Sequence, residues 1–273
     1  MKKTLFLLAA CLTFNTLFAA SVDTSSVYSS CMRKDIKCVV ITPETYKNTR
    51  LSFPVVYLVH GYSGCYNTWV KVVPEIKTYA DEMQMIIVCP DGGFSSWYFD
   101  SPVDSTFKYE TYVSREVVNY IDSHYRTIPD RNHRAITGLS MGGHGALYLA
   151  LKHSDIFGVA GSMSGGVDLR PFPKEWDIAK RIGDPVTDSL NWKNMSVVNL
   201  FDHYPSIPVA LMIECGTDDF FYQVNETLHK KLLGMKIPHD YVQRPGAHTW
   251  EYWANAVEYQ LLFFKKHFSE KGK

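Results

Sequence analysis

A serine between two glycines is the clearest sign of chemistry in this sequence. Ser140 lies between Gly138 and Gly142, after the short strand pattern of residues 134–137 and before a stretch rich in Ala and Leu that starts at Met141. A short strand, Gly-x-Ser-x-Gly and a helix together indicate a nucleophile elbow, the sharp turn that exposes a serine hydroxyl above a sheet. The helix would point its N-terminal N–H groups at whatever Ser140 attacks. An ordinary glycine-rich loop is the alternative, but the strand and helix patterns on either side favour the elbow.

A nucleophilic serine needs a base beside it, and the base needs an acid that orients it. Where a nucleophile elbow provides the serine, the chain order is Ser, then Asp or Glu, then His, on loops after successive strands. Asp218 and Asp219 follow the apolar run 208–215, and His248 follows the next predicted strand. We predict Ser140 as nucleophile, His248 as base and Asp219 as acid. Asp218 remains an alternative acid, although it could instead cap the helix that begins nearby.

A second glycine-containing loop follows the apolar run 53–59, in His60-Gly61-Tyr62. In α/β-hydrolases the loop after this strand supplies one half of the oxyanion hole, and the residue after the nucleophile supplies the other. We therefore predict the backbone N–H groups of Tyr62 and Met141 as oxyanion donors, each worth about 3–4 kcal/mol. A plain turn is the alternative for this loop. His60 is predicted to brace the loop, and His144 in the elbow helix to serve packing.

The remaining elements alternate between strand and helix patterns. This alternation predicts a mostly parallel, doubly wound sheet in a single catalytic domain over residues 21–273. Together with the nucleophile elbow, it indicates an α/β-hydrolase fold. An edge hairpin is predicted at 27–32 and 36–41. Further strands are predicted at 53–59, 85–89, 134–137, 158–163, 208–215 and 239–243, and helices at 72–83, 108–124, 221–234 and 250–267.

Residues 167–206 break this alternation, because they are rich in Pro, Asp, Trp and Lys and show weak periodicity. Such a long segment between two core strands predicts a cap or lid over the active site. Trp176 and Trp192 in this cap, with Trp97 and Tyr98 in the loop after strand 85–89, are candidate substrate contacts. Anchoring the cap to the body is an equal alternative for Trp176 and Trp192.

Composition limits the other classes of function. The chain has 273 residues, 46% of them hydrophobic, and a formal net charge of zero, which gives no indication of a nucleic-acid partner. No Cys/His spacing resembles a zinc site and there is no His-Glu-x-x-His, so no metal and no cofactor are predicted.

The N-terminus has the pattern of an export signal. Lys2 and Lys3 precede an apolar run, and small residues follow at 19–20, so residues 1–20 are predicted to be a signal peptide. The run is too short for a membrane span. The residues before Cys11 resemble a lipoprotein cleavage box, which leaves lipid anchoring as an alternative to a periplasmic or extracellular location.

Five cysteines follow the predicted signal peptide. Export permits disulfides, and Cys31 and Cys38 are close enough in sequence to be a candidate pair across the hairpin. Cys89 and Cys215 end apolar strands and are predicted to be buried thiols.

Several stretches resemble the esterase D family of α/β-hydrolases. They are His60 to Gly64, Pro90 to Gly92, Lys108 to Thr111, Tyr125 to Ile128, Arg134 to Ala146 and Asp219 to Tyr222, within a similarity that extends from about Asp35 to Phe268. The resemblance implies a triad of Ser140, Asp219 and His248, in agreement with the residue-based prediction. Family members include feruloyl and acetyl esterases, S-formylglutathione hydrolases and mycolyltransferases. The His-Gly loop is similar to the feruloyl and short-chain esterase branch, whereas S-formylglutathione hydrolases usually carry Ser-Gly-Leu-Thr-Cys there.

These observations predict an exported serine esterase that removes feruloyl, acetyl or other short acyl groups from plant-polysaccharide esters. The expected partner is a small ester or a feruloylated or acetylated oligosaccharide. An acyltransferase with the same acyl-enzyme is one alternative, and a thioesterase like S-formylglutathione hydrolase is another. A carbohydrate-binding homologue without catalysis is the least favoured reading. The acyl group and the oligomeric state stay open.

Overall fold

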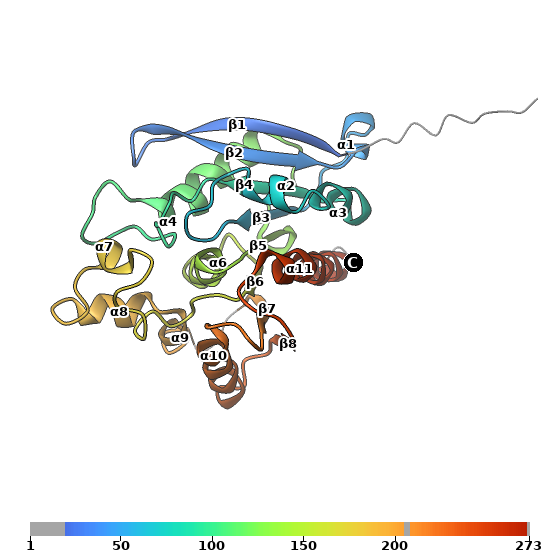
Figure 1. Ribbon diagram of the computed structural model, residues 1–273. Helices are drawn as coiled ribbons and strands as arrows, with labels where there is room; N and C mark the ends of the chain where they lie inside the picture. Colours follow the sequence, from blue (N-terminus) through green and yellow to red (C-terminus); the bar gives the residue numbers. More distant parts are fainter. Residues whose placement is uncertain (1–19, 205–207, 272–273) are drawn as a thin grey trace, which may run out of the picture.

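Eight strands form one central sheet in the order β1-β2-β4-β3-β5-β6-β7-β8 (Figure 1). The computed structural model describes residues 20–204 and 208–271. The predicted signal peptide up to residue 19 and the lipoprotein box at Cys11 lie outside the described residues. The strands are β1 (Ser21–Ser29), β2 (Lys34–Thr42), β3 (Val55–Val59), β4 (Ile86–Pro90), β5 (Arg134–Gly138), β6 (Val159–Met163), β7 (Ala210–Gly216) and β8 (Asp240–Arg244).

The sheet is antiparallel only at one edge. β1 pairs with β2 and β2 with β4 in antiparallel register, and every other pairing is parallel. The predicted mostly parallel, doubly wound sheet is therefore confirmed. An edge hairpin is present as predicted, but its first strand is Ser21–Ser29 and not 27–32, because residues 30–33 form the turn. Because the parallel strands all run the same way, the loops after β3, β5, β7 and β8 meet at one edge of the sheet, which is where open α/β sheets bind ligands.

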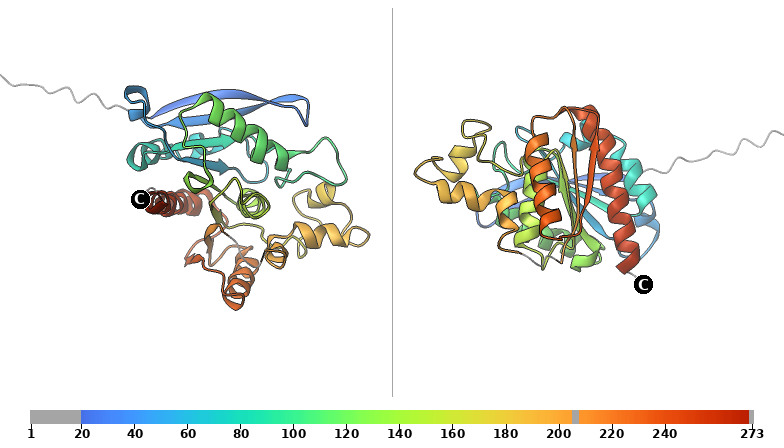
Figure 2. Two further views of the ribbon diagram at one scale, coloured as in Figure 1. Left: turned by 180° about the vertical axis from the view of Figure 1, so that it is seen from behind. Right: turned by 90° about the horizontal axis from the view of Figure 1, so that it is seen from below.

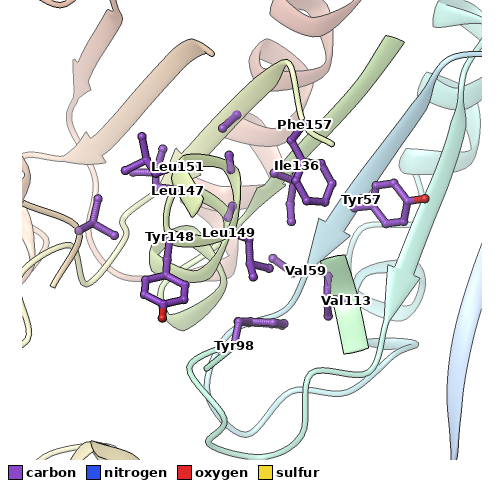
Figure 3. Packing of buried hydrophobic residues seen from close by; sticks show 14 of the residues in the cluster. Tyr57, Val59, Tyr98, Val113, Ile136, Leu147, Tyr148, Leu149, Leu151 and Phe157 are labelled. Atoms are coloured by element: carbon purple, nitrogen blue, oxygen red, sulfur yellow. The ribbon is translucent and has the colours of Figure 1, made fainter. Parts of the chain in front are cut away.

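The central strands are buried on both faces, as their continuous apolar runs predict. In β3, Val55, Tyr57 and Val59 belong to one core cluster, while Val56 and Leu58 belong to a second cluster on the other face. This alternation is the two-residue period of a strand. Figure 3 shows side chains of the elbow helix packed beside Val59 and Ile136 in the first cluster.

Helices cover both faces of the sheet. The helices are α1 (Thr45–Asn48), α2 (Thr68–Val72), α3 (Ile76–Met83), α4 (Tyr109–Thr111), the π-helical η1 (Tyr112–Val117), α5 (Val118–His124), the 3₁₀ turn η2 (Arg131–His133), α6 (Met141–Lys152), α7 (Ile178–Ile182), α8 (Ser189–Met195), α9 (Val197–Leu200), α10 (Tyr222–Gly234) and α11 (Trp250–Lys271). Residues of η1, α6 and α10 belong to the first core cluster, and residues of α2, α3 and α11 to the second. Figure 2 shows α10 and α11 on opposite sides of the strands.

Two predicted helices differ in detail from the structure. The predicted helix 72–83 is instead two helices, α2 and α3, separated at Val73 and Pro74, because proline fixes φ and cannot donate a helical hydrogen bond. The predicted helix 108–124 is helical over Tyr109–His124, but its middle, η1, is π-helical.

The predicted cap is present as an insertion between β6 and β7. Its described part carries α7, α8 and α9, which project from the body of the molecule (Figure 1), and residues 205–206 of the predicted range lie outside the description. The Trp192 indole N–H donates to the Gly183 carbonyl at 3.0 Å, and the Arg181 guanidinium pairs with Asp104 of the body at 2.8 Å. These contacts hold the cap together and attach it to the body.

The candidate disulfide is wrong, because Cys31 and Cys38 are both free thiols. Cys31 lies in the turn between β1 and β2, whereas Cys38 is buried in β2 opposite Ser25. The four residues from Lys34 to Cys38 span about 13 Å of strand. A disulfide needs Cα atoms within about 7 Å of each other. Cys89 and Cys215 are buried free thiols, as predicted.

The buried carboxylate of Glu110 links α4, the short helix before η1, to the elbow helix α6. Glu110 accepts hydrogen bonds from Tyr148 (3.0 Å), Lys152 (2.8 Å) and His153 (3.0 Å). Burial alone would raise the pKa of Glu110, but the hydrogen bonds from His153 and Lys152 and the charge of Lys152 outweigh it and lower the pKa to about 2. The ionised form is therefore the one that the fold stabilises.

We expect Glu110→Gln to lower the free energy of unfolding at pH 7 by about 3 kcal/mol, since each pKa unit corresponds to about 1.4 kcal/mol. The folded-state pKa is below its ordinary value of 4.5. The contribution is therefore complete above pH 4.5 and is lost as the pH falls toward 2. Urea unfolding at pH 7, 4 and 3 measures this difference. Glu258→Gln, at an exposed carboxylate, is the control, and an equal deficit of Glu110→Gln at all three pH values would contradict the assignment.

Candidate active site

Ser140 occupies a strained turn between β5 and α6. Its backbone has φ 56° and ψ −118°, a region that non-glycine residues rarely adopt. The Ser140 N–H donates to the Met163 carbonyl at 2.9 Å, and the Ser140 carbonyl accepts from His144 at 3.0 Å. The turn is therefore held by the neighbouring strand β6 and by the first turn of α6.

The two glycines that bracket Ser140 are required by a close approach of two chain segments. A Cβ at Gly138 would lie 2.5 Å from the Val59 carbonyl oxygen, and one at Gly142 would lie 2.6 Å from the His60 carbonyl oxygen. Any side chain at these positions would push the end of β3 away from the elbow. The Gly-x-Ser-x-Gly pattern thus keeps the two loops in contact, as a nucleophile elbow requires.

The structure brings Ser140, His248 and Asp219 into one hydrogen-bonded chain. His248 Nε2 lies 2.9 Å from Ser140 Oγ, and His248 Nδ1 lies 2.8 Å from Asp219 Oδ2. The Ser140 side chain is not sealed off, because the residue lines a cavity and is 9% exposed. This geometry allows the imidazole to accept the serine proton while the carboxylate holds its other nitrogen.

Asp219, and not Asp218, faces the histidine. Asp218 is exposed, and its backbone N–H donates to the Gly246 carbonyl at 2.9 Å. The alternative role of Asp218 as a helix cap is wrong as well, because it is Asp219 Oδ1 that accepts from the Phe221 N–H at 2.8 Å. Hydrogen bonds between loops 216–219 and 244–248 therefore set the acid beside the base.

Two backbone N–H groups are available for a developing oxyanion. Among the described residues, the N–H groups of Tyr62 and Met141 have no hydrogen-bond acceptor. Met141 is the first residue of α6, where N–H groups have no partner within the helix. Gly61 approaches the elbow closely, since a Cβ there would lie 3.4 Å from the Ser140 Cβ. The oxyanion loop and the nucleophile are thus direct neighbours.

His60 fixes the loop that carries Tyr62. Its ring is buried; Nε2 accepts from the Gly92 N–H at 2.7 Å, so Nδ1 carries the proton and donates to the Gly61 carbonyl at 2.8 Å. Burial lowers the pKa of His60, which keeps this neutral tautomer. The Tyr98 hydroxyl donates to the His60 carbonyl at 2.9 Å. These bonds support the predicted bracing role.

His144 packs inside the elbow helix. Nδ1 donates to the Gly166 carbonyl at 2.9 Å, and the ring contacts Trp97, Phe99 and Tyr148. Burial lowers the pKa of His144 to about 4, so the ring is neutral at pH 7. Its position agrees with the predicted packing role.

A cavity of about 450 Å³ opens beside Ser140. Its walls are mostly apolar and aromatic, which is typical of sites for small organic ligands. It is lined by Gly61, Tyr62, Ser63, Gly64, Thr68, Leu139, Ser140, Trp176, Phe220, His248, Trp250 and Trp253. The loop after β3, the turn that carries Ser140 and the imidazole of His248 therefore face one cavity.

Only one of the four predicted substrate contacts lines this cavity. Trp176 does, with its indole stacked on Phe220 at 5.4 Å between ring centroids. Trp97, Tyr98 and Trp192 are at most 2% exposed and do not line it. The left-handed backbone of Trp97 and Tyr98, with φ 54° and 61°, sends both rings into the core instead of the cleft. The predicted substrate contacts of Trp97, Tyr98 and Trp192 are therefore wrong, and these three side chains serve packing instead.

Three aromatic residues of the cavity were not predicted. Phe220 lies beside the acid, and Trp250 and Trp253 lie at the start of α11. Two tryptophans within five residues of the candidate histidine are a signal in the sequence, since a residue that close to the base tends to reach the same cavity.

The described part of the chain shows no metal site or membrane helix. No group of three or more His, Cys, Asp or Glu side chains within it could hold a metal ion. Nor does any of its helices combine the length and apolar composition needed to cross a membrane.

The fold and the site together define an α/β-hydrolase with a nucleophile elbow. The model of the esterase family, described as "Putative esterase", matches residues 29–264, and the chain belongs to this family. It is 27% identical over 259 residues to an acetyl esterase of Caldicellulosiruptor saccharolyticus, covering 85% of the chain and 95% of the relative. It is 34% identical over 286 residues to the diacylglycerol acyltransferase/mycolyltransferase Ag85A of Mycobacterium leprae, covering 86% and 80%.

A solved ferulic acid esterase superposes with a TM-score of 0.81 at 29% identity, covering 92% of the chain and 99% of that structure. The chain spans about half, 52%, of the length of two Mycobacterium tuberculosis esterases that it also matches, at 28% identity.

The bracing of the oxyanion loop predicts the effect of His60→Leu. This change leaves the buried Gly92 N–H without an acceptor, which costs about 1–3 kcal/mol of stability. It also frees the Gly61–Tyr62 backbone, and losing an oxyanion donor costs about 10²–10³ in kcat. We expect kcat for 4-nitrophenyl acetate to fall at least 10-fold. Tyr62→Phe, which keeps the backbone N–H, is the matched control and should stay within about 3-fold; equal kcat for His60→Leu and wild type would refute the bracing role.

Proposed function

We propose that this protein is a serine esterase that works through an acyl-enzyme. The observation that carries the proposal is the hydrogen-bonded chain from Ser140 through His248 to Asp219, open to a cavity that Tyr62 also lines. The backbone N–H groups of Tyr62 and Met141 have no acceptor among the described residues. A nucleophile, a base, an orienting acid and oxyanion donors are the parts that acyl transfer needs.

In the first half-reaction, Ser140 Oγ attacks the ester carbonyl and its proton passes to His248 Nε2. The carbonyl oxygen becomes an oxyanion between the N–H groups of Tyr62 and Met141, where positive helix-end dipoles also favour negative charge. Asp219 holds the Nδ1–H of the imidazolium. His248 then gives the proton to the departing alcohol oxygen as the carbon–oxygen bond breaks, which leaves the acyl group on Ser140. Water repeats these steps and releases the acid.

The cavity and the relatives support a proposal for the substrate class. Aromatic walls at Trp176, Phe220, Trp250 and Trp253 suit a planar hydroxycinnamoyl group, and they also admit a small acetyl group. The ferulic acid esterase and acetyl esterase relatives support the same two acyl groups. We propose feruloyl or acetyl esters of plant-polysaccharide fragments as substrates, and export by the N-terminal 20 residues fits such polymeric material.

An acyltransferase is the second candidate. The 34% identity to a diacylglycerol acyltransferase/mycolyltransferase favours it, because a transferase moves an acyl group to an acceptor other than water. The same Ser140 acyl-enzyme serves both reactions, so the acceptor that enters the cavity decides between them. Product analysis with and without an added sugar alcohol separates the two.

Substitution of the triad tests the mechanism. We expect Ser140→Ala to lower kcat for 4-nitrophenyl acetate by about 10⁶-fold and Asp219→Asn by about 10⁴-fold, the losses found in other serine hydrolases. Asp218→Asn, one residue away and exposed, is the control and should keep wild-type kcat. Activity of Ser140→Ala within 10-fold of wild type would reject the proposed nucleophile.

The acyl preference is tested with methyl ferulate beside 4-nitrophenyl acetate. Efficient cleavage of ferulate by the wild type, absent in Ser140→Ala, supports a feruloyl esterase. Turnover of acetate alone supports a short-chain esterase in which the aromatic walls do not contact substrate. If neither ester is hydrolysed in water alone, but its alcohol is released and its acyl group appears on an added sugar acceptor, the acyltransferase is the correct function.

A further inference from the structure

A chain of perpendicular aromatic rings connects His248 to the strand before the oxyanion loop. His248 and Trp253 rings lie 4.7 Å apart at 89°, Trp253 and Trp250 lie 5.4 Å apart at 90°, and Trp250 and Trp69 lie 5.2 Å apart at 85°. The Trp69 indole N–H then donates to the Val59 carbonyl at 3.1 Å. We call Trp69, Trp250 and Trp253 the tryptophan ladder.

The ladder joins three separate parts of the fold. Trp69 is in α2, Trp250 and Trp253 are in the first turn of α11, and Val59 is the last residue of β3, beside Gly138 in the sheet. The backbone N–H of Trp253 donates to the Thr249 carbonyl at 3.1 Å, so the Trp253 backbone is fixed in the first turn of the helix that begins directly after His248. The ladder therefore links the His248 side chain to the end of β3, where β3 contacts the nucleophile elbow.

Backbone hydrogen bonds fasten the histidine loop at Arg244 and Gly246, and the ladder acts on the His248 imidazole itself. Gly246 in this loop has φ 145°, and the His248 side chain is 15% exposed, while that of its partner Asp219 is fully buried. The Phe220 ring packs against another part of the imidazole, with 4.2 Å between the ring centroids. Rings from two parts of the chain, Phe220 and Trp253, therefore confine the His248 side chain. Edge-to-face ring pairs are directional, and this directionality can hold an imidazole at one angle.

We propose that Trp253 is a positioning residue for His248, and that Trp250 and Trp69 brace it. This rests on the proposed serine-hydrolase function of the same site. Trp253 packs edge-to-face against the His248 ring, so it acts by keeping Nε2 at hydrogen-bond distance from Ser140 Oγ. A loss of this alignment lowers the rate of Ser140 attack without weakening substrate binding.

The test compares Trp253→Phe, which keeps a ring, with Trp253→Leu, which keeps only apolar volume. One readout is the kcat and KM for 4-nitrophenyl acetate. The other is the rate at which a fluorophosphonate probe labels Ser140; there the serine oxygen bonds to phosphorus, fluoride leaves and His248 takes the proton. Trp192→Phe, a buried tryptophan away from the cavity, is the matched control.

For Trp253→Leu we expect about 10-fold lower kcat and labelling rate, with KM within 3-fold of wild type. Trp253→Phe should recover most of both rates, and Trp192→Phe should match wild type. If Trp253→Leu fails to fold by circular dichroism, Trp250→Leu, at a half-buried position, replaces it with an expected loss of about 3-fold.

Three results would overturn the proposal. A wild-type labelling rate in the leucine variant means that the ring does not position His248. A change confined to KM makes Trp253 a substrate wall, and equal losses in the leucine and phenylalanine variants make it a filler of volume. Labelling of wild type without hydrolysis of any ester would reject the esterase proposal alone, because labelling needs the Ser140–His248 pair and no particular ester.

Discussion

The contact between the end of β3 and the nucleophile elbow is the constraint on which the site depends. Cβ atoms at Gly138 and Gly142 would lie only 2.5 Å and 2.6 Å from the carbonyl oxygens of Val59 and His60, so the two turns touch backbone to backbone. This contact keeps the loop that carries Tyr62 next to the strained Ser140, since a Cβ at Gly61 would lie 3.4 Å from the Ser140 Cβ. The strain is maintained because hydrogen bonds from β6 and the first turn of α6 hold both sides of the turn.

The other half of the site is built by the same principle. Backbone bonds from Thr217 to Arg244 and from Asp218 to Gly246 fasten the loops after β7 and β8 together. Because these strands are parallel and adjacent, their carboxyl ends deliver Asp219 and His248 to the same sheet edge as Ser140. Rigid strands therefore position residues that are more than 100 positions apart in the chain.

Much of this could be predicted from the sequence, because the responsible signals are local. Continuous apolar runs such as 53–59 indicate strands buried on both faces, and the glycines around Ser140 indicate a turn with close backbone approach. The order Ser140, Asp219, His248 along alternating strands and helices then identified three residues that the structure joins by hydrogen bonds.

What could not be predicted depends on backbone angles and on distant partners. Trp97 and Tyr98 follow a strand, and their positions in the sequence predict side chains in the cleft. Left-handed φ values direct both side chains into the core instead. Cys38 is close to Cys31 in sequence, but the extended backbone of β2 carries Cys38 too far from the turn for a disulfide. Trp253 looked like an ordinary helix residue, and its contact with His248 follows from the helix starting two residues after the base.

The most direct test of the account is to trap the acyl-enzyme. Purified protein is mixed with 4-nitrophenyl acetate, quenched in acid within the first turnovers, digested and analysed by mass spectrometry. The account predicts one acetyl group on the peptide that contains Ser140, at a level that decays as substrate is exhausted. Continued ester turnover with no acetyl group on that peptide, or with the acetyl group on another residue, would contradict it.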